Sequence, residues 1–287
     1  MKLRVRALSF LISAGLLGAG ASAQSAGLAE PTLEVAEING QAMEIYVYRP
    51  ADCVSPSFLF VFHGNSRAAR SYAESAREIA DRACLTVFAP LFDEERFPRR
   101  QYHRGGITED GKIRPREEWT TGMVAALIRW AEAFEGRPGQ DIYLFGHSAG
   151  GQFLSRVAAY DLPAGVDRVV IANPSTYVLP TTDEEVPYGF SGLSAPAIPE
   201  LTREYLAAPV TIFLGEEDTG DEDLARNEEA ERQGVNRLDR GERTFAVARQ
   251  VARENGWPFN WRLVIADDVG HSGRGMLQSD HMMEALR

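Results

Sequence analysis

Residues 142–151 read IYLFGHSAGG, and this stretch decides the fold class of the chain. The apolar run 142–145 predicts a buried strand, and the residues that follow Ser148 have the spacing of a helix. Gly146 and Gly150 flank Ser148 and permit the sharp strand-to-helix turn that lifts a serine hydroxyl above the edge of a sheet. A glycine-rich strand exit with an incidental serine is the alternative, but the strand-turn-helix setting favours a nucleophile.

Short apolar runs separated by helical patterns surround this stretch, which is typical of a parallel sheet covered on both faces. Nearer the start of the chain, Asn39-Gly40 supplies a turn between two alternating segments and predicts a hairpin. We therefore predict an α/β fold with a mostly parallel eight-stranded sheet, helices on both faces and an N-terminal antiparallel hairpin. The expected strands after the hairpin are residues 58–62, 85–89, 142–145, 169–172, 210–214 and 261–265, and the expected helices are residues 69–83, 121–134, 149–160 and 243–254.

Three longer segments fit no regular element, and they are residues 91–118, 174–208 and 218–241. Long loops inside a compact domain are usually functional or disordered. The segment 174–208 is expected to be a cap-like insertion, in which Tyr177, Tyr188 and Phe190 either wall a substrate pocket or bury themselves in a packed loop. His103 in the first segment is expected to line the same pocket.

The first 23 residues have the pattern of a secretory signal peptide. Lys2, Arg4 and Arg6 precede an apolar run, and Ala21-Ser22-Ala23 matches a cleavage site. A retained membrane anchor is the alternative, but the apolar run is short for a spanning helix. We therefore expect cleavage near Ala23 and an exported domain, periplasmic or extracellular, of residues 24–287 without a membrane span.

The charge of the chain limits the kinds of partner it can have. The formal net charge is −11, and removal of residues 1–23 takes away three cations and no acid, which leaves −14. This charge argues against nucleic acid or anionic lipid as a partner. The acidic run 218–223 lacks the spaced oxygen ligands of a calcium loop, so a solvated charged face is expected there and no metal.

Two cysteines, Cys53 and Cys84, precede the expected strands 58–62 and 85–89. If these strands are parallel neighbours, both thiols lie at the same N-terminal edge of the sheet. Because an exported chain meets an oxidising compartment, we expect a Cys53–Cys84 disulfide, with two buried free thiols as the alternative.

A serine nucleophile needs a base, and position along the chain selects one of five histidines. His271 lies shortly after the last expected strand, in a glycine-flanked loop that should hang over the C-terminal edge of the sheet beside Ser148. His147 adjoins Ser148 and is expected to point elsewhere. His63 is expected to brace its own loop rather than act as the base, and His281 is expected to be structural.

The remaining parts of such a site are an acid and two oxyanion donors. Asp218 ends the segment Gly215-Glu216-Glu217-Asp218 after an expected strand and is the predicted acid, with Glu217 as the alternative. The backbone N–H of Asn65, after the strand 58–62, is expected to pair with that of Ala149 as the oxyanion hole.

These motifs, which are His63-Gly64, the turn around Ser148, Gly215 to Asp218 and Gly270-His271, resemble those of α/β-hydrolases. The resemblance covers nearly all of residues 24–287 and is to the secreted single-domain serine esterases, near the polyhydroxybutyrate depolymerase and feruloyl esterase-like branches. It implies ester hydrolysis through an acyl-enzyme without metal or organic cofactor. The chain departs from extracellular polymer depolymerases in having no appended binding domain, and its charged segment 219–241 is longer than a simple loop.

The leading functional hypothesis is therefore a secreted serine hydrolase that cleaves a small or oligomeric carboxylic ester. The same residues are suited to peptide cleavage, so a secreted serine peptidase of the same fold is the second hypothesis. A non-catalytic binding module is the third. The presence of candidates for nucleophile, base, acid and oxyanion donors argues against it.

Overall fold

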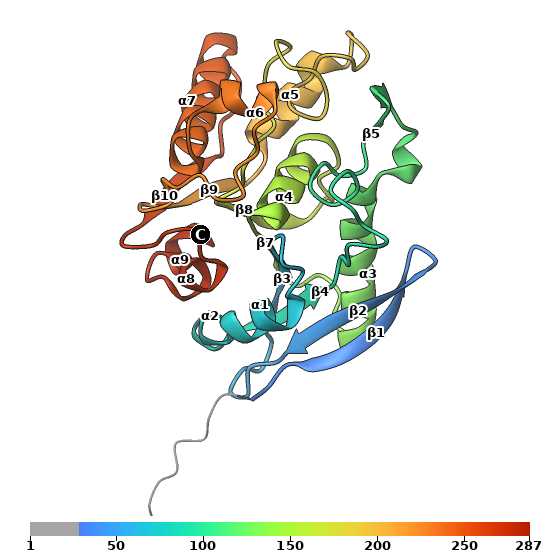
Figure 1. Ribbon diagram of the computed structural model, residues 1–287. Coiled ribbons are helices and arrows are strands. Elements are labelled where there is room, and N and C mark those ends of the chain that lie inside the picture. Colours follow the sequence, from blue (N-terminus) through green and yellow to red (C-terminus); the bar gives the residue numbers. More distant parts are fainter. Residues whose placement is uncertain (1–28) are drawn as a thin grey trace, which may run out of the picture.

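An eight-stranded sheet forms the centre of the molecule (Figure 1). Its strands lie in the order β1 (Thr32–Ile38), β2 (Gln41–Tyr48), β4 (Leu85–Pro90), β3 (Ser57–Phe62), β7 (Ile142–His147), β8 (Val166–Ala172), β9 (Val210–Gly215) and β10 (Arg262–Ala266). The computed structural model describes residues 29–287. Strand β2 pairs antiparallel with β1 and β4, and all other pairs in this sheet are parallel. The predicted fold class is confirmed.

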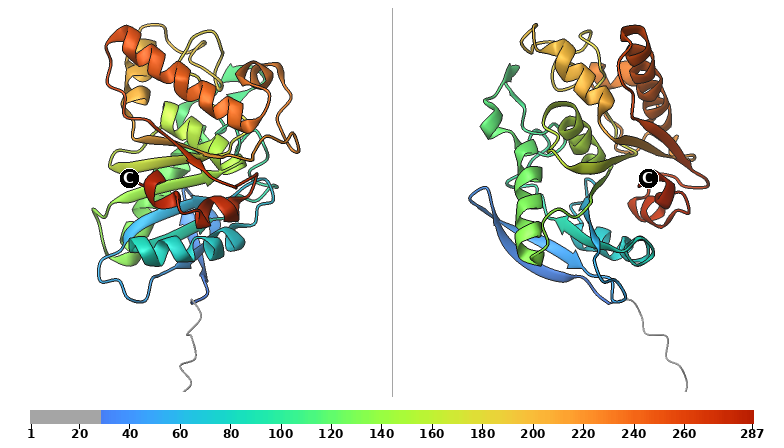
Figure 2. Two further views of the ribbon diagram at one scale, coloured as in Figure 1. Left: turned by 90° about the vertical axis from the view of Figure 1, so that its left-hand side faces the viewer. Right: turned by 180° about the vertical axis from the view of Figure 1, so that it is seen from behind.

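Helices cover both faces of this sheet, which explains why its central strands are continuous apolar runs. On β3, Phe58, Phe60 and Phe62 face one core and Leu59 and Val61 face the other. The first core is completed by α3 (Met123–Glu135), α4 (Ala149–Tyr160), α5 (Ile198–Ala207) and α7 (Arg237–Asn255). The second lies under α1 (Ala69–Ser75), α2 (Arg77–Ala83), α8 (Gly273–Gln278) and α9 (Met282–Ala285), so the first two described helices pack beside the last two (Figure 2).

Helix α4 has the predicted bounds, but two other helices differ from prediction. The expected helix 69–83 is divided at Ala76 into α1 and α2. Helix α7 begins at Arg237, well before residue 243, because the side chain of Asn236 caps it by accepting a hydrogen bond from the N–H of Asp239. The start of α7 lies in a highly charged segment, where no apolar periodicity indicates a helix.

The three segments expected to be irregular contain short elements. Residues 91–118 hold a small hairpin of β5 (Thr108–Glu109) and β6 (Lys112–Ile113). The insertion 174–208 ends in α5, which carries Pro199 in its first turn, where a missing N–H costs nothing. The third segment holds α6 (Glu228–Gln233) and the start of α7.

The predicted signal peptide, residues 1–23, lies outside the described residues. Among residues 29–287, no helix has the length and apolar character needed to cross a membrane.

The predicted Cys53–Cys84 disulfide is present in the structure, with the two Cα atoms 5.7 Å apart. Ser57 and Leu85 pair at the start of the parallel strands β3 and β4, so both cysteines lie at the N-terminal edge of the sheet, as expected. Cys84 itself adopts a left-handed conformation and ends α2. The bond therefore ties the entry into β3 to the helix that leads into β4.

Replacing both cysteines by serine should lower the free energy of unfolding by about 3–4 kcal/mol, because the bond closes a loop with a sequence separation of 31. Urea unfolding of the wild type and of Cys53→Ser/Cys84→Ser measures this difference. Alkylation of both thiols in the denatured wild type without reductant, seen as a mass shift, would contradict the bond.

Candidate active site

Ser148 sits between β7 and α4 with φ 55° and ψ −112°, a backbone conformation that a residue with a side chain rarely adopts. Glycines on either side make this turn possible. A Cβ on Gly146 would collide with the backbone of Gly150, and a Cβ on Gly150 would collide with the carbonyl of Phe62. The residues around Ser148 are therefore small because three backbone segments meet there.

The structure brings Ser148, His271 and Asp218 into one hydrogen-bonded chain. The hydroxyl Oγ of Ser148 lies 3.1 Å from Nε2 of His271, and Nδ1 of His271 lies 2.7 Å from Oδ2 of Asp218. Because Asp218 accepts at Nδ1, the proton of neutral His271 belongs on Nδ1, which leaves Nε2 free to accept from the serine. Glu217, the alternative acid, is exposed, and the carboxylate that bonds the histidine is that of Asp218.

Two residues that sequence reasoning missed hold the acid and the base in place. Asn173 directly follows β8, and its amide accepts a hydrogen bond from the N–H of Gly215 (2.9 Å) and donates to the carbonyl of Gly270 (3.5 Å). It thus connects the strand end before Asp218 with the loop that carries His271.

The second missed residue is Arg237, the first residue of α7. Its Nη1 lies 3.4 Å from Oδ1 of Asp218, and its Nη2 donates to the carbonyl of Glu222. Both partners of this ion pair are almost fully buried, with exposed fractions of 2% and 1%. The guanidinium offsets the cost of burying the carboxylate, since a lone buried charge is unfavourable.

Asn65 and Ala149 line the cavity beside Ser148. Among residues 29–287, the backbone N–H of neither residue donates a hydrogen bond to another protein group. Ala149 is also the first residue of α4, where the helix dipole adds a positive potential. Neither N–H group is therefore used within the described part of the protein.

The loop that carries Asn65 is braced by His63, as predicted. Its Nδ1 lies 2.9 Å from the carbonyl of Gly64, and its Nε2 accepts from the N–H of Phe92 at 3.1 Å. The carbonyl of His63 accepts from the hydroxyl of Tyr102 and from the N–H of Gly150. This second contact joins the loop to the turn at Ser148.

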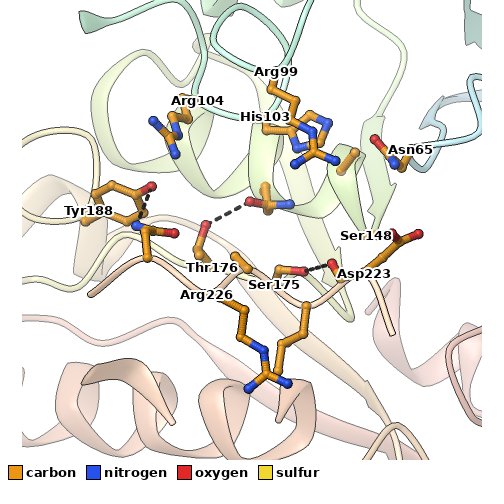
Figure 3. Close-up of a pocket in the computed structure, with 15 residues that line it drawn as sticks. Asn65, Arg99, His103, Arg104, Ser148, Ser175, Thr176, Tyr188, Asp223 and Arg226 are labelled. Atoms are coloured by element: carbon orange, nitrogen blue, oxygen red, sulfur yellow. Dashed lines mark hydrogen bonds between the residues drawn. The ribbon is translucent and has the colours of Figure 1, made fainter. Parts of the chain in front are cut away.

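A cavity of about 440 Å³ opens at Ser148 (Figure 3). Tyr188 and His103 line it, whereas Tyr177 and Phe190 do not. The expectation that these two rings wall the pocket is corrected by their complete burial in the core, where Phe190 packs on other aromatic rings. The lining residues are Asn65, Arg99, His103, Arg104, Ser148, Ala149, Gln152, Ser175, Thr176, Tyr188, Asp223, Leu224, Ala225, Arg226 and Asn227.

The arginines of this lining were also missed from the sequence. Arg99 and Arg104 flank the predicted His103 in the loop 91–118, so the density of arginine around an expected pocket residue was the available signal. No group of three or more His, Cys, Asp or Glu side chains within residues 29–287 is placed to hold a metal ion.

Two solved structures resemble this chain over most of its length. The poly(3-hydroxybutyrate) depolymerase LpqC from Bordetella parapertussis is 31% identical, with 88% of each chain covered and a TM-score of 0.80. Poly(aspartic acid) hydrolase-1 from Sphingomonas sp. KT-1 is 32% identical, with 88% of this chain and 97% of that chain covered and a TM-score of 0.80. The chain belongs to the esterase and depolymerase branch of the α/β-hydrolases. Its enzyme class is that of a carboxylic ester hydrolase.

A more distant structure shares the fold of this α/β-hydrolase. The hyperthermophilic esterase from Pyrobaculum calidifontis is 15% identical, with 90% of this chain and 83% of that chain covered and a TM-score of 0.52. No protein-family profile matches the chain, and no protein with a curated description matches it in sequence.

Two buried histidines of this hydrolase, His63 and His147, are neutral. Burial is the main cause that lowers the pKa of His63 to about 4 and that of His147 well below its usual value. Nδ1 of His147 lies 2.8 Å from the hydroxyl of Tyr72, and its ring lies against that of His271 at a centroid distance of 4.7 Å. His147 therefore forms part of the wall behind the base.

The low pKa of His63 predicts that the hydrolase loses stability in mild acid. The unfolded chain takes up a proton at His63 with a pKa near 6.5, whereas the folded protein does so only near 4. The contribution of neutral His63 to the free energy of unfolding is therefore complete above pH 6.5, and it falls as the pH is lowered toward 4. From pH 7 to pH 5, His63 alone should reduce the free energy of unfolding by about 2 kcal/mol.

Urea unfolding at pH 7 and pH 5 measures this loss in the wild type and in His63→Asn. The variant should lose about 2 kcal/mol less between the two pH values, whatever its stability at pH 7. An equal loss in both proteins would show that His63 does not titrate in this way.

Proposed function

We propose that this chain hydrolyses carboxylic esters through an acyl-enzyme formed on Ser148. The observation that carries the proposal is the hydrogen-bonded chain from Ser148 Oγ through His271 to Asp218, beside two unpaired backbone N–H groups. A nucleophile, a base with an orienting acid and oxyanion donors are the parts that acyl transfer requires.

In the first half of the reaction, Oγ of Ser148 attacks the ester carbonyl carbon while Nε2 of His271 accepts the hydroxyl proton. The negative charge moves to the carbonyl oxygen, where the N–H groups of Asn65 and Ala149 stabilise it. Asp218 stabilises the resulting imidazolium. Collapse of the intermediate breaks the bond to the alcohol oxygen, and His271 returns the proton to the departing alcohol.

In the second half, water replaces the alcohol. His271 accepts a proton from water as the water oxygen attacks the acyl carbon on Ser148. The same N–H groups stabilise the second oxyanion, and its collapse releases the carboxylic acid and returns the proton to Oγ. The protein ends the cycle in its starting state, so no co-reactant besides water is needed.

We infer that the hydrolase acts outside the cytoplasm, in the periplasm or the medium. The pattern of residues 1–23 supports export, and the Cys53–Cys84 bond fits an oxidising compartment. The similarity to a poly(3-hydroxybutyrate) depolymerase supports an oligoester of a hydroxy acid as substrate.

Hydrolysis of amide bonds is the second candidate function. It is favoured by the 32% identity to a poly(aspartic acid) hydrolase, whose substrate is joined by amides. The same three side chains are suited to that reaction, since serine-based acyl transfer acts on esters and amides alike. A panel of ester, peptide and poly(aspartic acid) substrates distinguishes the two candidates.

Ser148→Ala should lower kcat for p-nitrophenyl butyrate by about 10⁴-fold or more, because the covalent route is lost. Labelling by a fluorophosphonate probe should disappear in Ser148→Ala and in His271→Ala. His281→Ala is the matched control, because His281 bonds Asp267 near the surface and lies outside the chain of three residues. It should keep both activity and labelling.

Wild-type rates in Ser148→Ala would refute the acyl-enzyme.

A further inference from the structure

Arginines line more than one wall of the cavity, and two of them, Arg99 and Arg104, share a wall on the side opposite Arg226. Figure 3 shows Arg99, His103 and Arg104 on this wall, with Ser148 at one end of the cavity and Tyr188 at the other. The backbone N–H groups of His103 and Arg104 both donate to the carbonyl of Arg99. This tight turn directs the three side chains to the same wall.

A third guanidinium, that of Arg156 on α4, lies behind the cavity and is completely buried. It donates to the carbonyls of Pro187, Gln152 and Thr176 and to the hydroxyl of Thr176, and it lies 5.3 Å from the ring centre of Tyr188. Gln152, Thr176 and Tyr188 are themselves cavity residues. Uncharged carbonyl and hydroxyl groups thus hold the guanidinium of Arg156 directly behind the residues that line the cavity.

The arginine cluster, defined as Arg99, Arg104 and Arg156, has no ion-pair partner. Within residues 29–287, no carboxylate lies at ion-pair distance from any of its three members. Asp223 is the one carboxyl residue among the cavity residues, while Arg226 pairs with the exposed Asp221.

One further carboxylate, Glu229, lies near the cluster. Its pKa is lowered chiefly by a hydrogen bond from Asn227, and the charge of Arg104 is the smallest of the contributions. Glu229 forms no ion pair with Arg104, so the cluster keeps an excess of positive charge.

His103 lies beside Arg104 in the sequence and lines the same cavity. The residue is 9% exposed and lines the cavity, and its buried Nε2 has no hydrogen-bond partner in the described residues. Burial first, and then the positive charges of four arginines, lower its pKa to about 3. The same positive charges make this wall favourable for an anion.

We propose that Arg99 and Arg104, supported by Arg156, bind a carboxylate of the substrate, so that the hydrolase selects esters that carry a free negative charge. This inference rests on the proposed ester hydrolysis at Ser148. Guanidinium groups bind carboxylates through paired, charge-assisted hydrogen bonds. A strongly acidic chain repels anions in general, so the local arginines are needed to attract one to this cavity.

A matched pair of esters tests the proposal. Mono-p-nitrophenyl adipate carries a carboxylate at the end of a six-carbon acyl chain, and p-nitrophenyl hexanoate has the same chain length without charge. The measured quantity is kcat/KM for the charged adipate ester divided by kcat/KM for the neutral hexanoate ester. Spontaneous hydrolysis of each ester is subtracted first. Arg99→Gln and Arg104→Gln should each lower this ratio by about tenfold, the loss expected for one charged hydrogen-bond donor.

Arg243→Gln is the control, because Arg243 is an exposed arginine of α7 outside the cavity. It removes the same unit of charge and should leave the ratio unchanged. The proposal is overturned if the ratio in the two cavity variants equals that in Arg243→Gln.

A measurement on the wild type keeps the test decisive if a cavity variant fails to fold. Methyl p-nitrophenyl adipate has its carboxylate neutralised, and it should be hydrolysed with lower kcat/KM than the free acid. Added salt should reduce this difference by screening. A preference for the methyl ester would overturn the proposal.

These outcomes are distinct from failure of the proposed function. If Ser148→Ala hydrolyses both esters at the wild-type rate, the acyl-enzyme is refuted. If hydrolysis depends on Ser148 while the ratio is independent of Arg99 and Arg104, only carboxylate recognition is refuted.

Discussion

The close approach of backbone segments at Ser148 is the constraint on which the rest of the site depends. The N–H of Ser148 donates to the carbonyl of Ala172 at the end of β8, and the N–H of Gly150 donates to the carbonyl of His63 after β3. One strained turn is therefore fixed from both sides. Since the same contacts place the loop of Asn65, the nucleophile and the oxyanion donors share a single support, and a shift in one would move the other.

The parallel register of the sheet extends this support to the acid and the base. Strand β9 pairs with β8 on one side and β10 on the other, so the loops after β9 and β10 leave the same edge as Ser148. Backbone hydrogen bonds then lock these loops together, with the N–H of Glu217 donating to the carbonyl of Val269. Main-chain contacts thus place the three loops, and the side chains of Asn173 and Arg237 add to this support.

The parts of this structure that the sequence predicts are those governed by local patterns. Apolar runs locate the strands, and residues that follow parallel strands must meet at one edge, which is why Ser148, Asp218 and His271 were expected together. Tyr177 and Phe190 could not be placed from such local patterns. An aromatic ring in a long insertion has the same pattern whether it faces a cavity or the core, and only long-range packing decides between them. Arg99 and Arg104 were not predicted as cavity residues, because a charged side chain in a loop is normally solvated.

Three fully buried guanidiniums lie near the cavity, those of Arg156, Arg237 and Arg240, and they are held in two different ways. Arg240 donates to backbone carbonyls, among them those of the cavity residues Ser175 and Ala225. Arg237 is paired with a carboxylate, Asp218, so its charge is compensated within the structure. Arg156 is surrounded by carbonyls, a hydroxyl and an aromatic ring, which solvate the guanidinium without neutralising it. An apolar residue at position 156 would leave these buried acceptors without a donor, so the guanidinium also holds the cavity lining in place. Its charge adds positive potential behind Gln152 and Thr176, at the cavity in which the proposed carboxylate binds.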